Sequence, residues 1–193
     1  MIVYLHGFRS SPASRKAVML RERLAAFGRE AEFRCPALPA SPRAAAEIAL
    51  AAAEGTPADE LALIGSSLGG YYATWLAERL GCRAVLLNPA IDPARDLEPH
   101  VGRQPVYFSD DEIDFRPQFL AELRALETPV TRPERYFLLA ATGDSVIDYR
   151  TMVARYAGAR LHVIEGSNHE LTDFASYIDV VLAFCKMTPG GSN

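Results

Sequence analysis

The sequence L-A-L-I-G-S-S-L-G-G-Y-Y-A-T-W-L runs from Leu61 to Leu76 and is the most informative segment of the chain. Its short apolar run at 61–64 predicts a buried strand, and the apolar spacing that follows predicts a helix over 69–80. A G-x-S-x-G sequence at 65–69 joins the two. A strand, a tight glycine-containing turn and a helix in direct succession is the context in which this motif carries a nucleophilic serine.

Only one serine of this turn has glycine two positions away on both sides. Ser67 is flanked by Gly65 and Gly69, whereas Ser66 has isoleucine and leucine in the same places. Larger side chains there would collide where strand and helix close together, so the glycines have a steric role. Ser67 is therefore the candidate nucleophile. The alternative is a glycine-rich connection without chemistry.

Length and composition predict one domain, which we expect to span 1–187. The chain has 193 residues, of which 49% are hydrophobic. A formal net charge of -4 and scattered arginines provide no basic field for nucleic acid. Cys35, Cys82 and Cys185 follow no metal-ligand spacing and predict free thiols in a reducing compartment. No apolar run approaches the roughly 18 residues of a membrane span, and no signal-peptide pattern is visible, so we expect a cytoplasmic protein.

Strands and helices alternate along most of the chain. The order β-α-β-α-β-α-β, followed after a break by two more strand-helix pairs, indicates an α/β fold with a parallel sheet and helices on both faces. The tail at 188–193 is expected to be disordered. The expected strands are 2–5, 32–35, 61–64, 84–87, 136–141 and 160–165, and the expected helices are 14–27, 42–54, 69–80, 149–157 and 172–186.

The alternation breaks at 91–131. This segment is rich in proline, carries an acidic cluster at 110–114 and contains one expected helix at 117–126. We expect an irregular excursion that is either a lid over the carboxyl ends of the strands or a cover for a sheet edge. The acidic cluster lacks the spacing of an EF-hand loop, which favours a solvated face over a calcium site.

Asp144 and His169 directly follow the last two expected strands. A parallel sheet brings the carboxyl ends of its strands to one edge, which is also the edge that carries Ser67. The chain order Ser, Asp, His is that of α/β-hydrolases. Agreement of residue type, order and position predicts a triad of Ser67, Asp144 and His169.

Other residues compete for two of these roles. Asp148 precedes an expected helix and suits its N-cap, so Asp144 is favoured as the acid. His162 lies within a strand pattern and His100 within the 91–131 excursion. His6, at the end of the first strand, fits a histidine packed beneath the next loop better than a catalytic base.

The triad predicts acyl transfer. His169 would take the proton of Ser67 as the serine attacks an acyl carbonyl, and Asp144 would fix the tautomer of His169. The first strand ends at His-Gly-Phe, where a glycine turn lets the amide of Phe8 donate to an oxyanion. The amide of Leu68, at the start of a helix, is the second expected donor. Water then releases the acyl group, so we expect no metal and no cofactor.

Five segments carry a family resemblance: Y-L-H-G-F-R-S-S-P at 4–12, G-S-S-L-G-G-Y-Y-A-T-W-L at 65–76, N-P-A at 88–90, T-G-D-S-V-I-D-Y-R at 142–150 and E-G-S-N-H at 165–169. With these motifs the chain resembles the small bacterial esterases of the YqiA/YcfP type, within the α/β-hydrolase superfamily. The resemblance implies a trimmed α/β-hydrolase fold with six parallel strands in the order 2-1-3-4-5-6, the same roles for the triad, and activity toward short acyl esters. Leu171 departs from the aromatic residue expected two positions after the histidine, which bears on the shape of the pocket.

The leading prediction is a serine hydrolase that cleaves short-chain carboxylic esters of small molecules through an acyl-enzyme. An acyl thioesterase with the same triad is the nearest alternative, and a non-catalytic binding protein on the same scaffold is another. Tyr71, Tyr72 and Trp75 could line an acyl pocket, although their helical spacing favours core packing. Arg9 could face an anionic substrate, but a solvated loop arginine is favoured.

Overall fold

The central sheet contains six parallel strands, and the structure confirms their predicted order. The computed structural model describes residues 1–107 and 111–189. The first strand of the chain lies inside the sheet. The second strand pairs with one side of it, and the later strands follow one after another on the other side. Across the sheet the strands are β2 (Phe33–Arg34), β1 (Ile2–Leu5), β3 (Ala62–Ser66), β4 (Arg83–Leu87), β7 (Tyr136–Ala141) and β8 (Arg160–Ile164).

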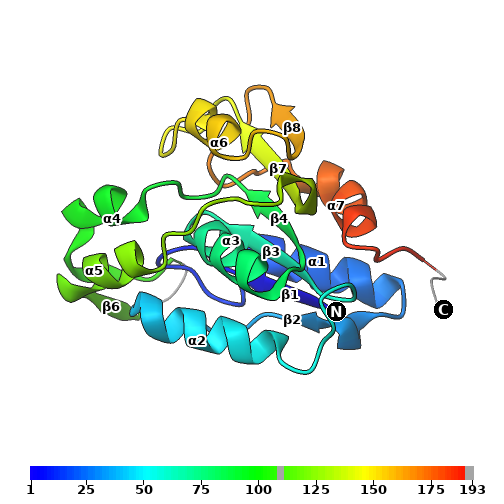
Figure 1. Cartoon of the computed structure of the whole chain (residues 1–193), viewed down its shortest axis with the longest axis horizontal. Helices are drawn as coiled ribbons and strands as arrows, with labels where there is room; N and C mark the ends of the chain where they lie inside the picture. Colours follow the sequence, from blue (N-terminus) through cyan, green and yellow to red (C-terminus); the bar gives the residue numbers. More distant parts are fainter. Residues whose placement is uncertain (108–110, 190–193) are drawn as a thin grey trace.

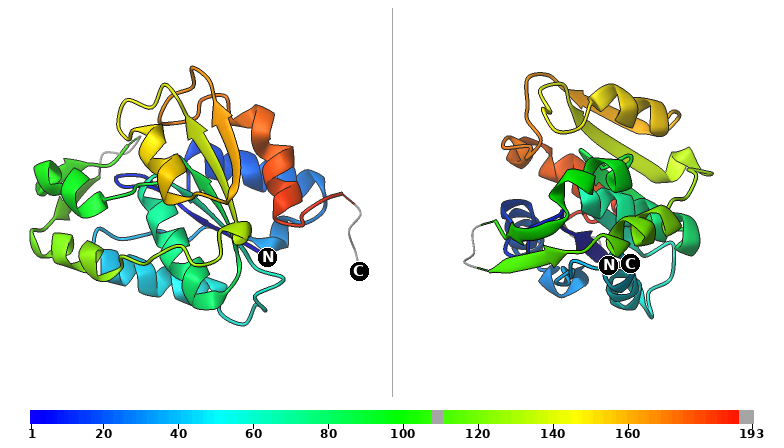
Figure 2. Two further views of the ribbon diagram at one scale, coloured as in Figure 1. Left: turned by 45° about the horizontal axis from the view of Figure 1, so that its top comes forward. Right: turned by 90° about the vertical axis from the view of Figure 1, so that its left-hand side faces the viewer.

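Helices cover both faces of this sheet (Figures 1 and 2). On one face α1 (Arg15–Ala26) and α7 (Ile178–Phe184) pack against alternate strand residues such as Ile64. On the other face α2 (Pro42–Ala53), α3 (Leu68–Leu80) and α6 (Tyr149–Arg155) pack against the intervening residues, such as Leu63. Side chains alternate between faces along a strand, so a strand covered on both faces must be apolar throughout. This explains the continuous apolar runs in the sequence.

Helix ends follow the expected local chemistry at several places. Ser41 caps α2 by accepting a hydrogen bond from the amide of Ala44 at 3.3 Å, and Pro42 occupies the first helical position. Gly81 ends α3 in a left-handed conformation with φ 76°. Toward the carboxyl terminus the expected single helix at 172–186 is wrong in detail, because a 3₁₀ turn, η4 (Phe174–Tyr177), precedes the shorter α7.

The segment 91–131 is more ordered than the sequence predicted. The expected helix is present as α5 (Gln118–Ala125), but the expectation of an otherwise irregular excursion was wrong. An antiparallel hairpin forms from β5 (Gly102–Pro105) and β6 (Glu112–Phe115), and a short helix, α4 (Pro93–Asp96), precedes it. Figure 1 shows α4, α5 and β6 grouped at one end of the molecule. Part of the acidic cluster, Asp110, lies outside the described residues, as does 190–193 of the expected disordered tail.

The three cysteines are free. Cys82 and Cys185 are buried and Cys35 is half-buried. Burial raises the pKa of the thiols to about 11 for Cys35 and Cys82 and to about 12 for Cys185. These thiols therefore stay protonated near neutral pH.

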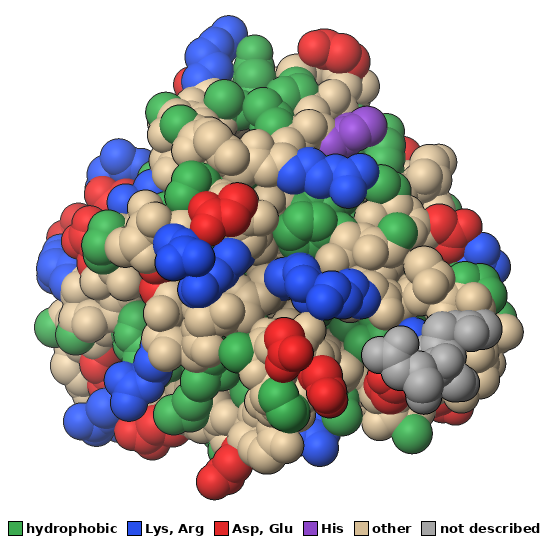
Figure 3. Space-filling view, turned by 45° about the vertical axis from the view of Figure 1, so that its right-hand side comes forward, with side chains coloured by type: hydrophobic (Ala, Val, Ile, Leu, Met, Phe, Trp, Pro, Cys, Tyr) green, Lys and Arg blue, Asp and Glu red, His purple; other side chains and the backbone are tan. Residues whose placement is uncertain are grey.

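Charges of both signs are interspersed on the surface. On the face drawn in Figure 3, Lys and Arg side chains lie among Asp, Glu and apolar side chains. Within the described residues, none of the helices combines the length and the apolar character needed to cross a lipid bilayer.

Candidate active site

Ser67 lies at the turn between β3 and α3, in a conformation that is rare for a residue with a side chain. Its backbone has φ 53° and ψ -120°. A Cβ atom at Gly65 would lie 2.3 Å from the carbonyl oxygen of Gly69, and one at Gly69 would lie 1.9 Å from that of Leu5. Both distances are far below contact, so only glycine fits at either position. The geometry agrees with the steric role predicted for these residues.

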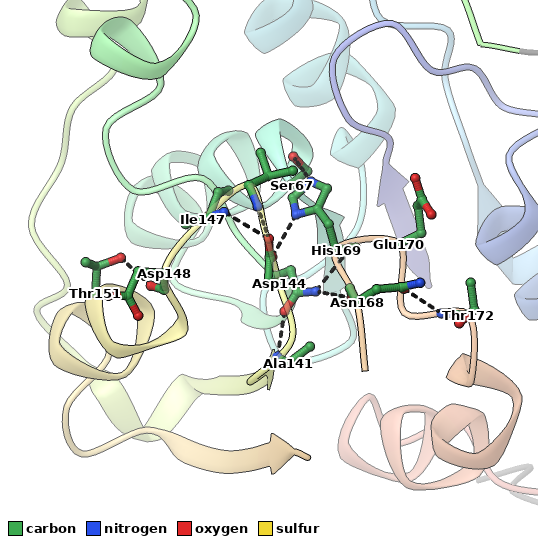
Figure 4. A network of polar contacts seen from close by, with 12 residues as sticks. Ser67, Ala141, Asp144, Ile147, Asp148, Thr151, Asn168, His169, Glu170 and Thr172 are labelled. Carbon is green, nitrogen blue, oxygen red and sulfur yellow. Dashed lines mark hydrogen bonds and ion pairs between the residues drawn. The ribbon is translucent and has the colours of Figure 1, made fainter. Parts of the chain in front are cut away.

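Ser67, His169 and Asp144 form one hydrogen-bonded row (Figure 4). The Nε2 atom of His169 is 3.0 Å from Oγ of Ser67, and its Nδ1 atom is 2.7 Å from Oδ2 of Asp144. Since Asp144 presents a carboxylate acceptor, the Nδ1 atom is the protonated one. The Nε2 atom is then free to accept the proton of the serine hydroxyl. Three side chains that the sequence expected at one sheet edge therefore lie within hydrogen-bond reach.

Asp144 is held by its own loop. Its side chain has no exposed surface, and Oδ1 accepts hydrogen bonds from the amides of Val146 at 2.8 Å and Ile147 at 2.9 Å. This leaves Oδ2 directed at His169. The rival Asp148 instead accepts from the amide of Arg150 at the start of α6, as its N-cap pattern predicted. The two aspartates thus have different partners.

Asn88, at the end of β4, was not identified as a site residue from the sequence. It is fully buried and has a positive φ of 43°. Its Oδ1 atom accepts from the amide of Ala141 at 2.8 Å, and its Nδ2 atom donates to the carbonyls of Asn168 at 3.0 Å and His169 at 3.1 Å. The side chain thus ties the histidine loop to the end of β7. The only signal in the sequence was its position in the N-P-A motif directly after a strand.

Lys16 supports the same loop from α1. Its Nζ atom donates to the carbonyl of Glu170, next to the histidine, at 2.6 Å. Burial lowers the pKa of this amine to about 8, and the charge of Glu170 opposes that shift. Within the loop, Ser167 donates to Asp173 at 2.5 Å. The histidine loop is therefore fixed by residues from three parts of the chain.

The candidate oxyanion donors lie on the other side of Ser67. A Cβ atom at Gly7 would lie 3.3 Å from Cβ of Ser67, which places the peptide leading to Phe8 beside the serine. Leu68 is the first residue of α3, where a helix leaves amides without an intrahelical partner. Phe8 and Leu68 both line one small pocket. This arrangement is compatible with the expected pair of donors.

His6 has a structural role in this region, as the sequence favoured. Its Nε2 atom accepts from the amide of Leu38 at 3.0 Å, so the proton must lie on Nδ1, which donates to the carbonyl of Gly7 at 3.0 Å. Burial lowers the pKa of the imidazole, which keeps it neutral. The side chain therefore connects the loop after β1 to the loop after β2.

The remaining histidines contact aromatic rings. His162 packs against Tyr177 with ring centres 5.0 Å apart, and His100 lies 6.1 Å from the ring of Phe8. No group of three or more metal-ligating side chains occurs in the part of the chain that the structure describes.

The aromatic residues of α3 divide between core and pocket. The hydroxyl of Tyr71 donates to the carbonyl of Leu123 at 2.8 Å, as a buried structural tyrosine would. Trp75 packs against the core with Arg79 over its ring. Tyr72 is buried and lines the pocket beside the oxyanion donors. The preference for core packing therefore holds for Tyr71 and Trp75, and Tyr72 has both roles.

The strand order and the serine turn define the α/β-hydrolase fold, and solved structures agree. Alpha/beta hydrolase domain-containing protein 10 from mouse matches with a TM-score of 0.67 and 17% identity over 97% of this chain and 90% of that one. Est1E from Butyrivibrio proteoclasticus, solved with ferulic acid bound, matches with a TM-score of 0.64 and 13% identity over 96% and 86%. A monoacylglycerol lipase from Paleococcus ferrophilus matches with a TM-score of 0.62 and 17% identity over 97% and 94%.

A comparison of sequences assigns the protein to one family within this class. The chain belongs to the uncharacterised protein family UPF0227, the YqiA/YcfP family, whose model matches residues 1–186. The match confirms the resemblance carried by the five sequence motifs.

Proposed function

We propose that this protein is a serine hydrolase that cleaves short-chain carboxylic esters through an acyl-enzyme. The observation that carries the proposal is the hydrogen-bonded row of Ser67, His169 and Asp144 beside a strained serine turn. A strained, exactly placed hydroxyl next to an oriented imidazole is the requirement for nucleophilic catalysis. The names of similar proteins, a monoacylglycerol lipase among them, support a hydrolase.

The geometry supports a two-step reaction. His169 takes the hydroxyl proton through Nε2 while Oγ of Ser67 bonds to the acyl carbon, and the carbonyl electron pair moves to the oxygen. The amides of Phe8 and Leu68 stabilise that oxyanion. When the oxyanion collapses, the bond to the alcohol oxygen breaks and His169 returns the proton to the leaving alcohol. Water, activated by the same imidazole, then releases the acid and restores Ser67.

Hydrolysis of p-nitrophenyl esters of increasing acyl length tests the proposal. Ser67→Ala should lower kcat by about a millionfold, because loss of a triad nucleophile typically costs that much. The matched control is Ser66→Ala, which removes a hydroxyl one residue away and should retain turnover. Undiminished turnover in the Ser67 variant would remove this serine from the mechanism.

The same assay separates the other two hypotheses. An acyl thioesterase would use the identical triad and prefer acyl-CoA thioesters over oxygen esters of matched acyl length. A non-catalytic binding protein would show no turnover of either substrate and no covalent labelling of Ser67 by a fluorophosphonate.

A further inference from the structure

A small pocket adjoins the two candidate oxyanion donors. Phe8 and Leu68 line it, and so does Gly7, where a Cβ atom would lie 3.3 Å from Cβ of Ser67. The rest of the lining is mostly apolar, with three polar residues on the side of the first two loops. The apolar residues are Leu38, Pro39, Ala40, Tyr72, Val106 and Ile113, and the polar residues are His6, Arg9 and Ser10. Ile113 belongs to β6, and Val106 directly follows β5, so the hairpin that the sequence did not predict provides one side of the pocket.

Sheet order places this pocket and His169 on opposite sides of Ser67. The loops after β1 and β2 line the pocket together with α3 and the hairpin, whereas Asp144 and His169 follow β7 and β8. In the sheet, β1 and β2 lie on one side of β3, and β4, β7 and β8 lie on the other. Ser67 directly follows β3 and therefore stands between the pocket and the imidazole.

The chemistry of ester cleavage assigns a direction to each substituent of the tetrahedral carbon. The oxyanion must face the amides of Phe8 and Leu68. The leaving oxygen must face Nε2 of His169, because it takes its proton from there. The acyl substituent then extends away from His169, which is the direction of the pocket.

We propose, resting on the proposed function, that this pocket is the acyl-binding subsite and that Ile113 and Val106 set the length of the acyl chain. The pocket volume of about 40 Å³ is well below the roughly 150 Å³ of a cavity that holds benzene. A short, unbranched aliphatic acyl group is the class of ligand that fits. The preference for short acyl groups then has a structural cause in the hairpin.

Arg9 makes three contacts with the segment at the end of β5. Nε of Arg9 donates to the carbonyl of Pro105 at 2.7 Å, and the guanidinium lies 4.5 Å from the ring centre of Tyr107. The amide of Tyr107 donates to the carbonyl of Arg9 at 2.7 Å. Arg9 is a partly exposed loop residue whose Nε atom and backbone carbonyl both bind the hairpin. It fixes the pocket wall next to Phe8.

The test is an acyl-length series of p-nitrophenyl esters, from acetate to decanoate, with two variants of Ile113. Ile113→Ala enlarges the pocket and should raise kcat/KM for octanoate relative to acetate by at least about tenfold, since each buried methylene contributes about fourfold. Ile113→Phe narrows the pocket and should lower kcat/KM for butanoate relative to acetate. The matched control is Ile48→Ala on the exposed face of α2, which should leave the profile unchanged.

The outcomes separate this inference from the proposed function. Ser67-dependent turnover with an unchanged acyl profile in both Ile113 variants would overturn the acyl subsite and leave the esterase intact. The Ile113 variants could instead change the preference among acetate esters of different alcohols and leave the acyl profile unchanged. That result would assign the pocket to the leaving group and would also overturn the acyl subsite. A wild-type protein without ester turnover would overturn the proposed function and the subsite together.

Discussion

Two neighbouring aspartates compete for one role at the end of β7, and their contacts distinguish them. Asp144 accepts three hydrogen bonds, one of them from His169, whereas Asp148 caps α6. Asp144→Asn should lower kcat by about 10,000-fold, because an amide at this position favours the wrong imidazole tautomer. Ester kinetics measure the effect. The matched variant Asp148→Asn keeps a capping oxygen and should leave kcat within a small factor, and the reverse pattern would contradict the assignment.

Asn88 is a positioning residue for His169, because its Nδ2 atom donates a hydrogen bond to the backbone carbonyl of His169. Asn88→Asp keeps the shape and tolerates the positive φ, but it replaces both donated hydrogen bonds with an acceptor facing two carbonyls. We expect kcat to fall with little change in KM, and unfolding free energy to fall by about 1–3 kcal/mol.

Asn168, in the loop that carries His169, offers a matched Asn→Asp change as a control. Among the described residues, the side chain of Asn168 uses its Oδ1 atom, which accepts from the amide of Thr172 at 3.3 Å, so Asn168→Asp preserves this contact. It should retain kcat. Equal losses of kcat in the two variants would show that a negative charge, rather than the position of His169, causes the effect.

At the scale of elements, the approach of α3 to the sheet depends on two glycines. A Cβ atom at Gly69 would lie 1.9 Å from the carbonyl oxygen of Leu5 and 2.7 Å from that of His6, so the backbones of α3 and of the end of β1 would have to separate. Gly69→Ala should lower the free energy of unfolding by about 3 kcal/mol or more, as measured by urea denaturation. Gly55→Ala serves as the control. Gly55 has φ 78° with open space around it, so its variant should cost only about 1 kcal/mol.

The β5–β6 hairpin shows why one element escaped prediction. Its strands read G-R-Q-P and E-I-D-F, with a glycine and a proline in one strand and acidic residues in the other. Glycine, proline and aspartate are depleted in strands, so local propensity opposes the observed structure. Pairing instead depends on tertiary contacts such as Phe115 packed 5.1 Å from the ring of Phe8. The excursion is therefore ordered by the loop that it covers.

At the scale of the whole molecule, His6 links stability to pH. The pKa of its buried imidazole is lowered, so the folded state favours the neutral form more than the unfolded state does. The contribution of His6 to the free energy of unfolding is complete above about pH 6.5, the pKa of histidine in the unfolded chain. It is lost as pH falls from there toward the lower pKa that His6 has in the folded protein. Urea unfolding from pH 8 to pH 5 should show this loss.

His6→Gln provides the comparison for that titration. Its amide oxygen can still accept from Leu38 but does not titrate, so the decline in stability below about pH 6.5 should be smaller than in the wild type. Parallel curves for the two proteins would exclude His6 as a source of the pH dependence.

Local patterns in the sequence predicted a parallel sheet, helices on both of its faces and the three residues to be tested as a triad, because these features depend on apolar periodicity, on glycines beside Ser67 and on the rule that parallel strands end at one edge. The strand order was implied by the family resemblance and is confirmed by the structure. The contacts of Asn88 with the histidine loop, those of Arg9 with the hairpin and the side chains around the pocket became known from the three-dimensional structure. Those contacts join residues that are far apart along the chain, and no local pattern encodes which distant partners meet.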